Sequence, residues 1–225
     1  MISDSLRSSV ACQYLKGEGI EIGALHSPLK VPSHARIRYL DRMPTNLLKQ
    51  TYPELLQHNL VEVDIVDDGE ILSSVPDTSV DFIIANHMIE HCQNPIFSLK
   101  NWLRVVKPGG ILYIAVPDKR HTFDCERPVT TLEHLLRDYT EGPGWSKNAH
   151  FEEWARLVDK YPEPDVEGRA LGLAALNYSI HFHVWTQMEF AELLIHCRSR
   201  LSLPFEIELL QKNGEEFIAI LSKVD

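Results

Sequence analysis

The sequence lacks the features of a membrane, secreted or disulfide-stabilised protein. No stretch approaches the roughly 20 apolar residues that a membrane span needs, and residues 1–19 contain no continuous apolar core typical of a secretory signal. The four cysteines are far apart and form no CxxC pair, which argues against a disulfide framework or a cysteine-based zinc site. We therefore expect a cytoplasmic protein that does not bind membranes.

Positive charge is also scarce. The 225 residues include 22 Lys and Arg against 32 Asp and Glu, which gives a formal net charge of −10. No run of Lys or Arg forms a local basic patch, and an acidic surface repels phosphate backbones. The counts favour a small-molecule partner over nucleic acid and leave the oligomeric state open. The length suits a single domain over residues 1–225.

Short apolar segments alternate with helix-like segments along the first two-thirds of the chain. Continuous apolar strands separated by helices are typical of a parallel sheet covered on both faces. Near the carboxyl terminus, two apolar runs flank Asn213-Gly214, a dipeptide typical of a tight hairpin turn. The sequence thus predicts an α/β fold that ends in an antiparallel hairpin. The parallel strands are expected at residues 19–25, 35–43, 60–66, 80–85 and 111–117.

Three helices have recognisable start signals. Asn94 has the side chain of an N-cap, Pro95 suits the first helical position, and the KPGG run at residues 107–110 should end that helix. Thr130 and Thr186 are each followed three residues later by Glu, which is the spacing of a capping box. These signals predict helices that begin at or just after each of the three residues.

The stretch at residues 118–178 differs from the rest of the chain because it is rich in His, Arg, Trp, Gly and Pro. It follows the fifth strand and precedes the last helix. We interpret it as a partly helical insertion that forms a lid over the carboxyl ends of the strands, where open α/β sheets bind their ligands. The alternative is a surface excursion without a role in the site.

The turn after the first strand lacks the G-x-G-x-x-G pattern of dinucleotide-binding proteins. In the run EIGALHSP only Gly23 is present, and Pro28 and Pro32 occur before the second strand. A proline within a helix removes a hydrogen bond and clashes with the preceding turn. No long helix can then present its amino end to a pyrophosphate, so a nicotinamide oxidoreductase is disfavoured.

A cofactor without phosphate groups fits this turn. S-adenosylmethionine combines adenosine, an amino acid and a sulfonium. Carboxylates follow three successive strands: Glu21 beside the first turn, Asp41 after the second for the ribose hydroxyls, and Asp64, Asp67 and Asp68 after the third for the adenine edge. Alternatively, Glu21 could bond backbone amides of the turn, Asp41 could cap the next turn, and the three aspartates could form a solvated loop.

These features resemble the class I S-adenosylmethionine-dependent methyltransferases. The resemblance rests on EIGAL, YLD, SVDFIIANHMIEH, LKNWLRVVKPGG and ILYIAVPD, and it covers residues 19–118. It implies a Rossmann-like, seven-stranded, mostly parallel sheet with one antiparallel strand. It also implies cofactor contacts at Gly23 and Ala24, and at Ala85 and Asn86 near the methionine end. The first turn departs from the family because the later glycines are missing.

The same resemblance defines the chemistry that the chain should perform. The leaving group of methyl transfer is a neutral thioether, so catalysis rests on holding nucleophile and methyl in line, and a base helps when the acceptor is a hydroxyl. For any one histidine the alternative is a hydrogen-bonded imidazole of the core. The candidate catalytic residues are His87, His91, His121 and His183, and the candidates for substrate binding are Asp118, Arg127 and His181.

A metal is not expected at the run after the fourth strand. Some quinone-pathway O-methyltransferases have a similar E-x-x-E-H run, but here His87 replaces the first glutamate ahead of Glu90 and His91. The sequence therefore predicts an S-adenosylmethionine-dependent methyltransferase that acts on a small molecule or sugar at a hydroxyl or carboxyl oxygen. The alternatives are a catalytically degenerate methyltransferase fold that serves as a binding protein and, less favoured, an NAD-dependent oxidoreductase.

Overall fold

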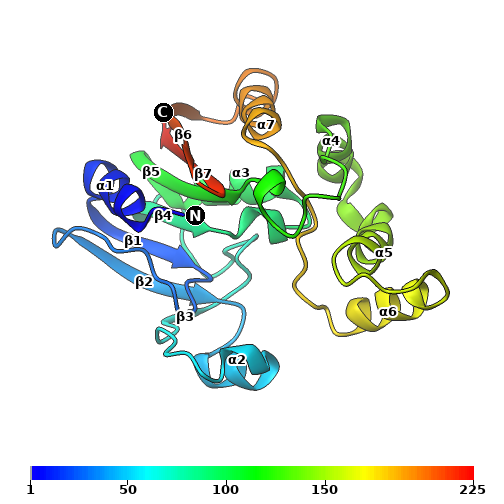
Figure 1. Ribbon diagram of the computed structural model, residues 1–225. Coiled ribbons are helices and arrows are strands. Elements are labelled where there is room, and N and C mark those ends of the chain that lie inside the picture. The colour runs from blue at the N-terminus through cyan, green and yellow to red at the C-terminus, as the bar shows by residue number, and fades with distance from the viewer. Residues whose placement is uncertain (1) are drawn as a thin grey trace.

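A seven-stranded sheet forms the centre of the computed structural model, which describes residues 2–225 (Figure 1). The strand order is β3-β2-β1-β4-β5-β7-β6, and neighbours are parallel except that β7 runs antiparallel to both β5 and β6. This confirms the predicted α/β class and the antiparallel terminal hairpin. The strands are β1 (Gly17–Ile22), β2 (Ala35–Asp41), β3 (Ile65–Val66), β4 (Val80–Asn86), β5 (Val106–Pro117), β6 (Phe205–Asn213) and β7 (Glu216–Lys223).

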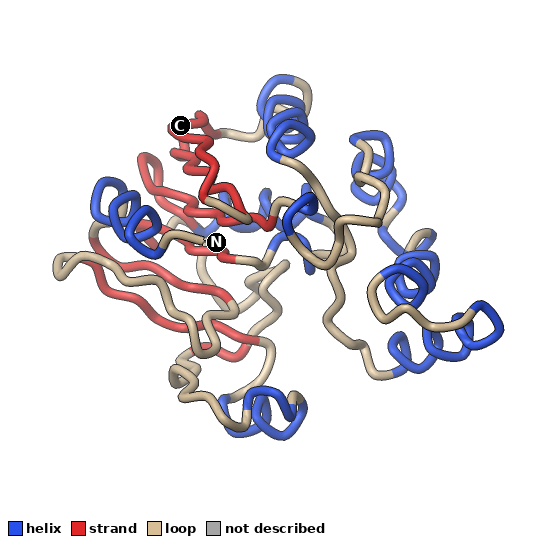
Figure 2. Tube along the Cα trace, in the orientation of Figure 1, coloured by secondary structure: helices blue, strands red, loops and turns tan. Residues whose placement is uncertain are grey.

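Helices connect the strands and form most of the insertion (Figure 2). No helix lies between β1 and β2, as the two prolines of that loop predict. None of the helices in the described part of the chain is long and apolar enough to cross a bilayer. The α-helices are α1 (Asp4–Tyr14), α2 (Thr45–Thr51), α3 (Pro95–Val105), α4 (Leu132–Glu141), α5 (Lys147–Leu157), α6 (Glu163–Ala175) and α7 (Gln187–Ser199), and the 3-10 turns are η1 (Pro53–Leu55), η2 (Ile89–His91), η3 (Lys119–His121) and η4 (Pro143–Trp145).

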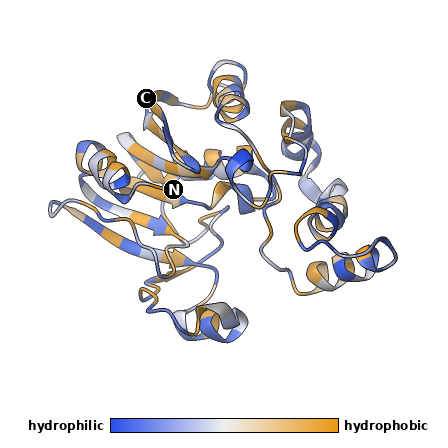
Figure 3. Ribbon diagram, viewed as in Figure 1, coloured by the Kyte–Doolittle hydropathy of each residue, from blue (hydrophilic) through white to orange (hydrophobic). Residues whose placement is uncertain are grey.

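Apolar layers cover both faces of the sheet. Alternate residues of a strand point to opposite faces, so Ile83 joins one buried cluster with Leu99 of α3 and Leu193 of α7. Phe82 joins the other cluster, with Val10 of α1. Figure 3 shows hydrophobic residues recurring along the strands between these helices. Burial of each such side chain contributes about 1.5–3 kcal/mol, so these layers position the strand ends rigidly.

Local signals place most helix starts correctly. The Asn94 side chain accepts a hydrogen bond from the amide of Phe97 at 3.1 Å, and Thr186 forms the full capping box. The prediction for Thr130 was wrong by one residue, because Thr131 caps α4. The hydroxyl of Thr130 instead accepts from the Val184 amide at 3.0 Å. A contact distant in the sequence therefore decides which threonine is the cap.

Two strands differ in extent from their predictions. β3 has two residues rather than seven, because the Asp64 carboxylate accepts the Tyr39 amide at 2.8 Å where a backbone carbonyl would continue the ladder. β5 begins at Val106, directly after α3, so the KPGG run lies inside the strand and not before it. The register with β4 shifts there, and Gly109 adopts a φ of 74° that favours glycine.

The insertion at residues 118–178 contains η3, α4, η4, α5 and α6, which confirms that it is partly helical. Figure 1 shows it on the side of the sheet toward which the β1 arrow points. It has a small apolar core of its own, in which Phe151 and Trp154 of α5 pack with Leu173 of α6. Ile180 and Phe182, in the extended segment that follows α6, complete this core.

Candidate functional site

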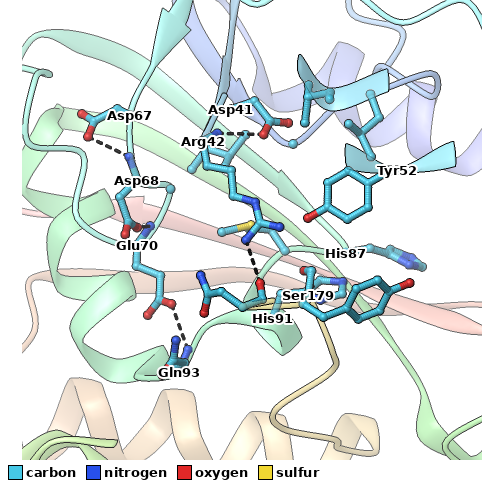
Figure 4. A pocket seen from close by; sticks show the side chains of 18 of the residues that line it. Asp41, Arg42, Tyr52, Asp67, Asp68, Glu70, His87, His91, Gln93 and Ser179 are labelled. Atoms are coloured by element: carbon cyan, nitrogen blue, oxygen red, sulfur yellow. Dashed lines mark hydrogen bonds between the residues drawn. The ribbon is translucent and has the colours of Figure 1, made fainter. Parts of the chain in front are cut away.

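A cavity of about 620 Å³ opens at the carboxyl ends of the parallel strands (Figure 4). Small-molecule sites usually measure about 300–1,000 Å³, and open α/β sheets bind ligands where the strand order reverses, here between β1 and β4. The segments after β1, β2, β3 and β4 form its floor, and α2, η1 and the segment after α6 form its walls. Its lining residues include Gly23, Asp41, Arg42, Leu48, Tyr52, Asp67, Asp68, Glu70, His87, His91, Gln93, Tyr178, Ser179 and Phe182.

The first turn is held in shape by Glu21. Both oxygens of its buried carboxylate accept the Leu29 amide, at 2.9 and 3.1 Å, and burial raises the pKa of Glu21 to about 7. Neither Glu21 nor the buried Ala24 is among the residues that line the cavity. The Glu21 carboxylate bonds a backbone amide of the loop after β1 instead. Gly23 does line the cavity, with a φ of 66° and open space where a Cβ would stand.

Asp41 reaches the cavity at the end of β2. One carboxylate oxygen accepts the Arg42 amide at 2.7 Å, and burial raises the pKa of Asp41 against the opposing effect of Arg42. The Arg42 guanidinium donates to the carbonyl of Asn177 at 3.4 Å (Figure 4). This bond ties the rim of the sheet to the segment after α6, as expected if the insertion closes over the site.

After β3, the structure brings Asp67 and Asp68 to the cavity and leaves Asp64 outside it. Asp64 is instead bonded to the edge of β2, as described above. Hydroxyls of Ser73 and Ser74 donate to Asp67 at 2.9 and 2.7 Å. Burial opposes the charge of Asp67, but the bonds from Ser74 and Ser73 outweigh it and keep the pKa of Asp67 below its usual value.

The end of β4 forms the back of the site. Ala85 is fully buried, and the Asn86 amide donates to Glu21 at 3.5 Å. Neither residue is among those that line the cavity. Asn86 Oδ1 is buried and has no hydrogen-bond partner among the described residues. These two residues therefore support the first turn from behind.

His87 follows β4 and lines the cavity with an uncommon backbone conformation, a φ of 49°. Its Nε2 lies 2.7 Å from Oε2 of Glu216. The other oxygen of this carboxylate accepts hydrogen bonds from Arg7 and Asn213. Burial opposes ionisation of Glu216, but the bonds from His87 and Arg7 outweigh it and lower the pKa of Glu216 to about 2. Burial also opposes the imidazolium of His87, yet Glu216 and Glu90 raise the pKa of His87.

His91 also lines the cavity but has a different environment. It lies in η2, and its Nδ1 is 2.8 Å from the carbonyl of Ile180. Burial, with the nearby His181, lowers the pKa of His91 to about 3, so the imidazole is neutral. The adjacent Glu90 is fully buried, and neither of its carboxylate oxygens has a hydrogen-bond partner among the described residues.

The other predicted site residues lie outside the cavity lining. His121 is exposed, with Nε2 3.3 Å from Lys212 Nζ. Asp118 is buried and paired with Arg120. His183 is fully buried in the segment after α6. His183 and His181 belong to separate groups of side chains, the first with His134, Asp138 and His150 and the second with Glu90 and His91.

Arg127 and His181 belong to a buried ionic network. Arg127 is 2% exposed and donates to Asp124 at 2.8 Å and to Glu153 at 2.7 Å. The Nδ1 of His181 lies 2.7 Å from the other oxygen of Asp124. The network thus joins residues from the turn after η3, from α5 and from the segment after α6, and it fixes the insertion behind the cavity wall.

One group of side chains was missed by the sequence reasoning. His134, Asp138 and His150, all in the insertion, converge with His183 of the segment after α6. The signal for two of them was present, because His134 and Asp138 are four residues apart on a predicted helix and so share one face. The partners from α5 and from the segment after α6 could not be paired with them without the fold.

Comparisons with known proteins agree with this architecture. Residues 17–114 match a protein family described as a methyltransferase domain. A SAM-dependent methyltransferase from Aquifex aeolicus superposes with a TM-score of 0.51 at 12% identity, over 100% of this chain and 90% of that chain. One from Thermotoga maritima gives 0.52 at 15% identity, over 98% and 91%. A comparison with curated proteins finds no match.

A further structural neighbour has a different description. A Rhodobacter sphaeroides protein described among the Zn-dependent alcohol dehydrogenases gives a TM-score of 0.56 at 14% identity, over 100% of this chain and 92% of that chain. Identities this low show a shared fold alone. The loop at residues 23–34 contains no helix whose amino end could face a pyrophosphate. Residues 17–114 therefore match a methyltransferase domain, and the chain as a whole shares the fold of solved SAM-dependent methyltransferases.

Proposed function

We propose that the chain transfers the methyl group of S-adenosylmethionine to a hydroxyl or carboxyl oxygen of a small molecule or sugar bound in the cavity. One observation carries the proposal. Gly23, Asp41, Asp67, Asp68 and His87 come from the ends of four parallel strands, and all line the same cavity. A glycine turn, carboxylates and an imidazole are the groups that the cofactor and an oxygen acceptor require.

The cavity residues fit the parts of this cofactor. At Gly23 the backbone is open, so the methionine part can approach the turn closely. Asp41 offers carboxylate oxygens to the ribose hydroxyls, and Asp67 and Asp68 offer acceptors to the adenine amino group. Leu48 gives this side of the cavity an apolar wall. When bound, the cofactor supplies a methyl group activated by the sulfonium.

We assign the role of general base to His87. Its Nε2–H donates to Glu216, which leaves Nδ1 as the basic nitrogen of the neutral ring. Arg7 and Asn213 hold Glu216 in place, so the imidazole is oriented by a fixed carboxylate. Strained backbone conformations such as that of His87 cluster at functional sites. In this arrangement Nδ1 accepts the proton of the acceptor hydroxyl as the methyl group is transferred.

Calorimetry and a methyl-transfer assay test the proposal. S-adenosylmethionine and its demethylated product should both bind, and a panel of hydroxyl and carboxyl compounds should reveal turnover. His87→Gln should lower kcat by about 10²- to 10⁴-fold, which is the usual contribution of a general base, and should leave the cofactor Kd unchanged. His196→Gln on α7 is the matched control and should retain full activity. Absence of cofactor binding to the wild type would refute the proposal.

A further inference from the structure

Four side chains of types that bind metals converge between the insertion and the segment that follows it, and none of them lines the cavity. His134 and Asp138 lie one turn apart on α4, His150 lies on α5, and His183 lies in the segment between α6 and α7. Each offers one ligand atom, and these atoms all lie within 4.8 Å of one another. We call these four residues the His134 cluster.

Three of the six distances between ligand atoms of the His134 cluster are close to those of a tetrahedral metal site. His134 Nε2 lies 3.1 Å from His150 Nε2 and 3.3 Å from Asp138 Oδ2, and the same oxygen lies 3.5 Å from His183 Nε2. Bonds of about 2.0–2.1 Å from zinc to nitrogen and oxygen imply about 3.3–3.4 Å between neighbouring ligands of a regular tetrahedron. The measured distances lie on both sides of that value.

Two polar atoms in the cluster lack partners. Asp138 and His183 are fully buried, and Asp138 Oδ2 and His183 Nδ1 have no hydrogen-bond partner among the described residues. A buried carboxylate oxygen without a partner is unfavourable, and a cation would supply one.

Surrounding groups orient the ligands. The Ser146 hydroxyl donates to Asp138 Oδ1 at 3.0 Å, which directs Oδ2 toward the histidines. The ring of Trp145 lies 4.7 Å from that of His134 and packs against it. Such outer contacts are typical of metal sites, where they fix the direction of each ligand.

We propose that the His134 cluster binds one zinc ion. Imidazole and carboxylate ligands in tetrahedral arrangement suit zinc, and four protein ligands leave no open position for a substrate or water. The ion is therefore structural. It joins α4 and α5 to the segment that contributes Ser179 and Phe182 to the cavity wall. This inference does not depend on the proposed methyl acceptor.

A second cluster, formed by Glu90, His91 and His181, provides the matched control. It has three donors, and its two histidines already use Nδ1 in bonds to the Ile180 carbonyl and to Asp124. Glu90→Gln removes a buried carboxylate from this cluster without touching the His134 cluster. Comparing it with Asp138→Asn separates loss of a metal ligand from general loss of a buried carboxylate.

The test is metal analysis of the full chain purified without a histidine tag. We expect about one zinc per chain in the wild type and in Glu90→Gln. His150→Gln and Asp138→Asn should bind zinc at least about 100-fold more weakly. Chelator-treated wild type should regain a higher Tm when zinc is added, and Co²⁺ in its place should give the visible absorption of a tetrahedral site.

The outcomes decide the proposal even if a variant fails to fold, because the wild type alone can be depleted and reconstituted. Wild type that contains no zinc, gains none on addition and shows no change in Tm would overturn it. Zinc lost in Glu90→Gln but retained in Asp138→Asn would place the ion at the other cluster and would also overturn it.

Discussion

The sheet and the insertion are stabilised in different ways. Between α1 on one face and α3 with α7 on the other, the sheet buries apolar side chains almost throughout. The insertion has a small apolar core, and beside it lie buried charged and imidazole groups: Asp124, Arg127, Asp138, His181 and His183. Apolar burial is not directional, whereas a buried ion pair requires its partner at a defined place. The stability of the insertion therefore depends on a few specific contacts. Single substitutions should destabilise the insertion more than they destabilise the sheet.

The largest expected effect comes from Arg127→Met. This change leaves Asp124 and Glu153 near one another without their shared cation, and breaking a buried pair usually costs about 3–5 kcal/mol. Denaturant unfolding should show a loss of that size. The control is Arg156→Ala. Arg156 pairs with the exposed Glu163, and loss of this exposed ion pair should change the free energy of unfolding by about 0–1 kcal/mol. Equal effects of the two changes would remove the distinction between the buried and the exposed pairs.

Within the fold, local signals located the strands but did not locate all of their ends. Strands at the centre were predicted because their apolar runs are continuous, and the hairpin because Asn213-Gly214 specifies a turn. β3 pairs on one side only, and its length depends on the Asp64 carboxylate, which bonds a residue 25 positions away. The cap at Thr131 likewise depends on what Thr130 contacts across the insertion.

Asp41→Ala tests whether the sheet edge binds the cofactor. Removal of hydrogen bonds to a charged acceptor should weaken binding by about 1.5–3 kcal/mol, or roughly 10- to 150-fold in Kd. Calorimetry with the cofactor measures the change. Asp64→Ala is the matched control. Asp64 directly precedes β3 at the same edge of the sheet, but its carboxylate bonds the Tyr39 amide and lies outside the cavity. An unchanged Kd for Asp41→Ala would show that the ribose assignment is wrong.

The pH dependence of stability should report on His91, where the sheet meets the segment after α6. Burial and His181 lower its pKa from 6.5 to about 3 in the folded chain. Between these values the unfolded state binds a proton that the folded state does not, so stability falls as the pH falls, by about 1.4 kcal/mol per unit at most. Above pH 6.5 and below about 3 this contribution is constant.

Unfolding of the wild type and His91→Gln between pH 6.5 and 4 measures this contribution. The free energy of unfolding of the variant should fall less steeply toward acid pH than that of the wild type. The difference between the two free energies of unfolding should therefore narrow as the pH falls. Parallel curves would mean that His91 is not held neutral by its surroundings.

The residues predicted at strand ends divide into two groups, because Glu21, Ala24, Asp64, Ala85 and Asn86 lie outside the cavity lining. Gly23, Asp41 and His87 were predicted from their positions after strands, and each lines the cavity. Arg127 and His181 were expected to bind substrate, but both bond Asp124, which lies three residues before Arg127 and 57 residues before His181. Polar contacts between distant segments leave no periodic trace in a sequence, which is why the insertion was the harder region to predict.

The smallest expected effect is that of Gly23→Ala, and it separates strain from binding. A φ of 66° is unfavourable for alanine by about 1–2 kcal/mol, and no atom lies within 4 Å of the new Cβ. Gly109→Ala introduces similar strain at a φ of 74°, also in open space, but outside the cavity. Both variants should lose similar stability in thermal unfolding, whereas only Gly23→Ala should weaken cofactor binding. Equal affinity in the two variants would mean that the cofactor does not approach the first turn.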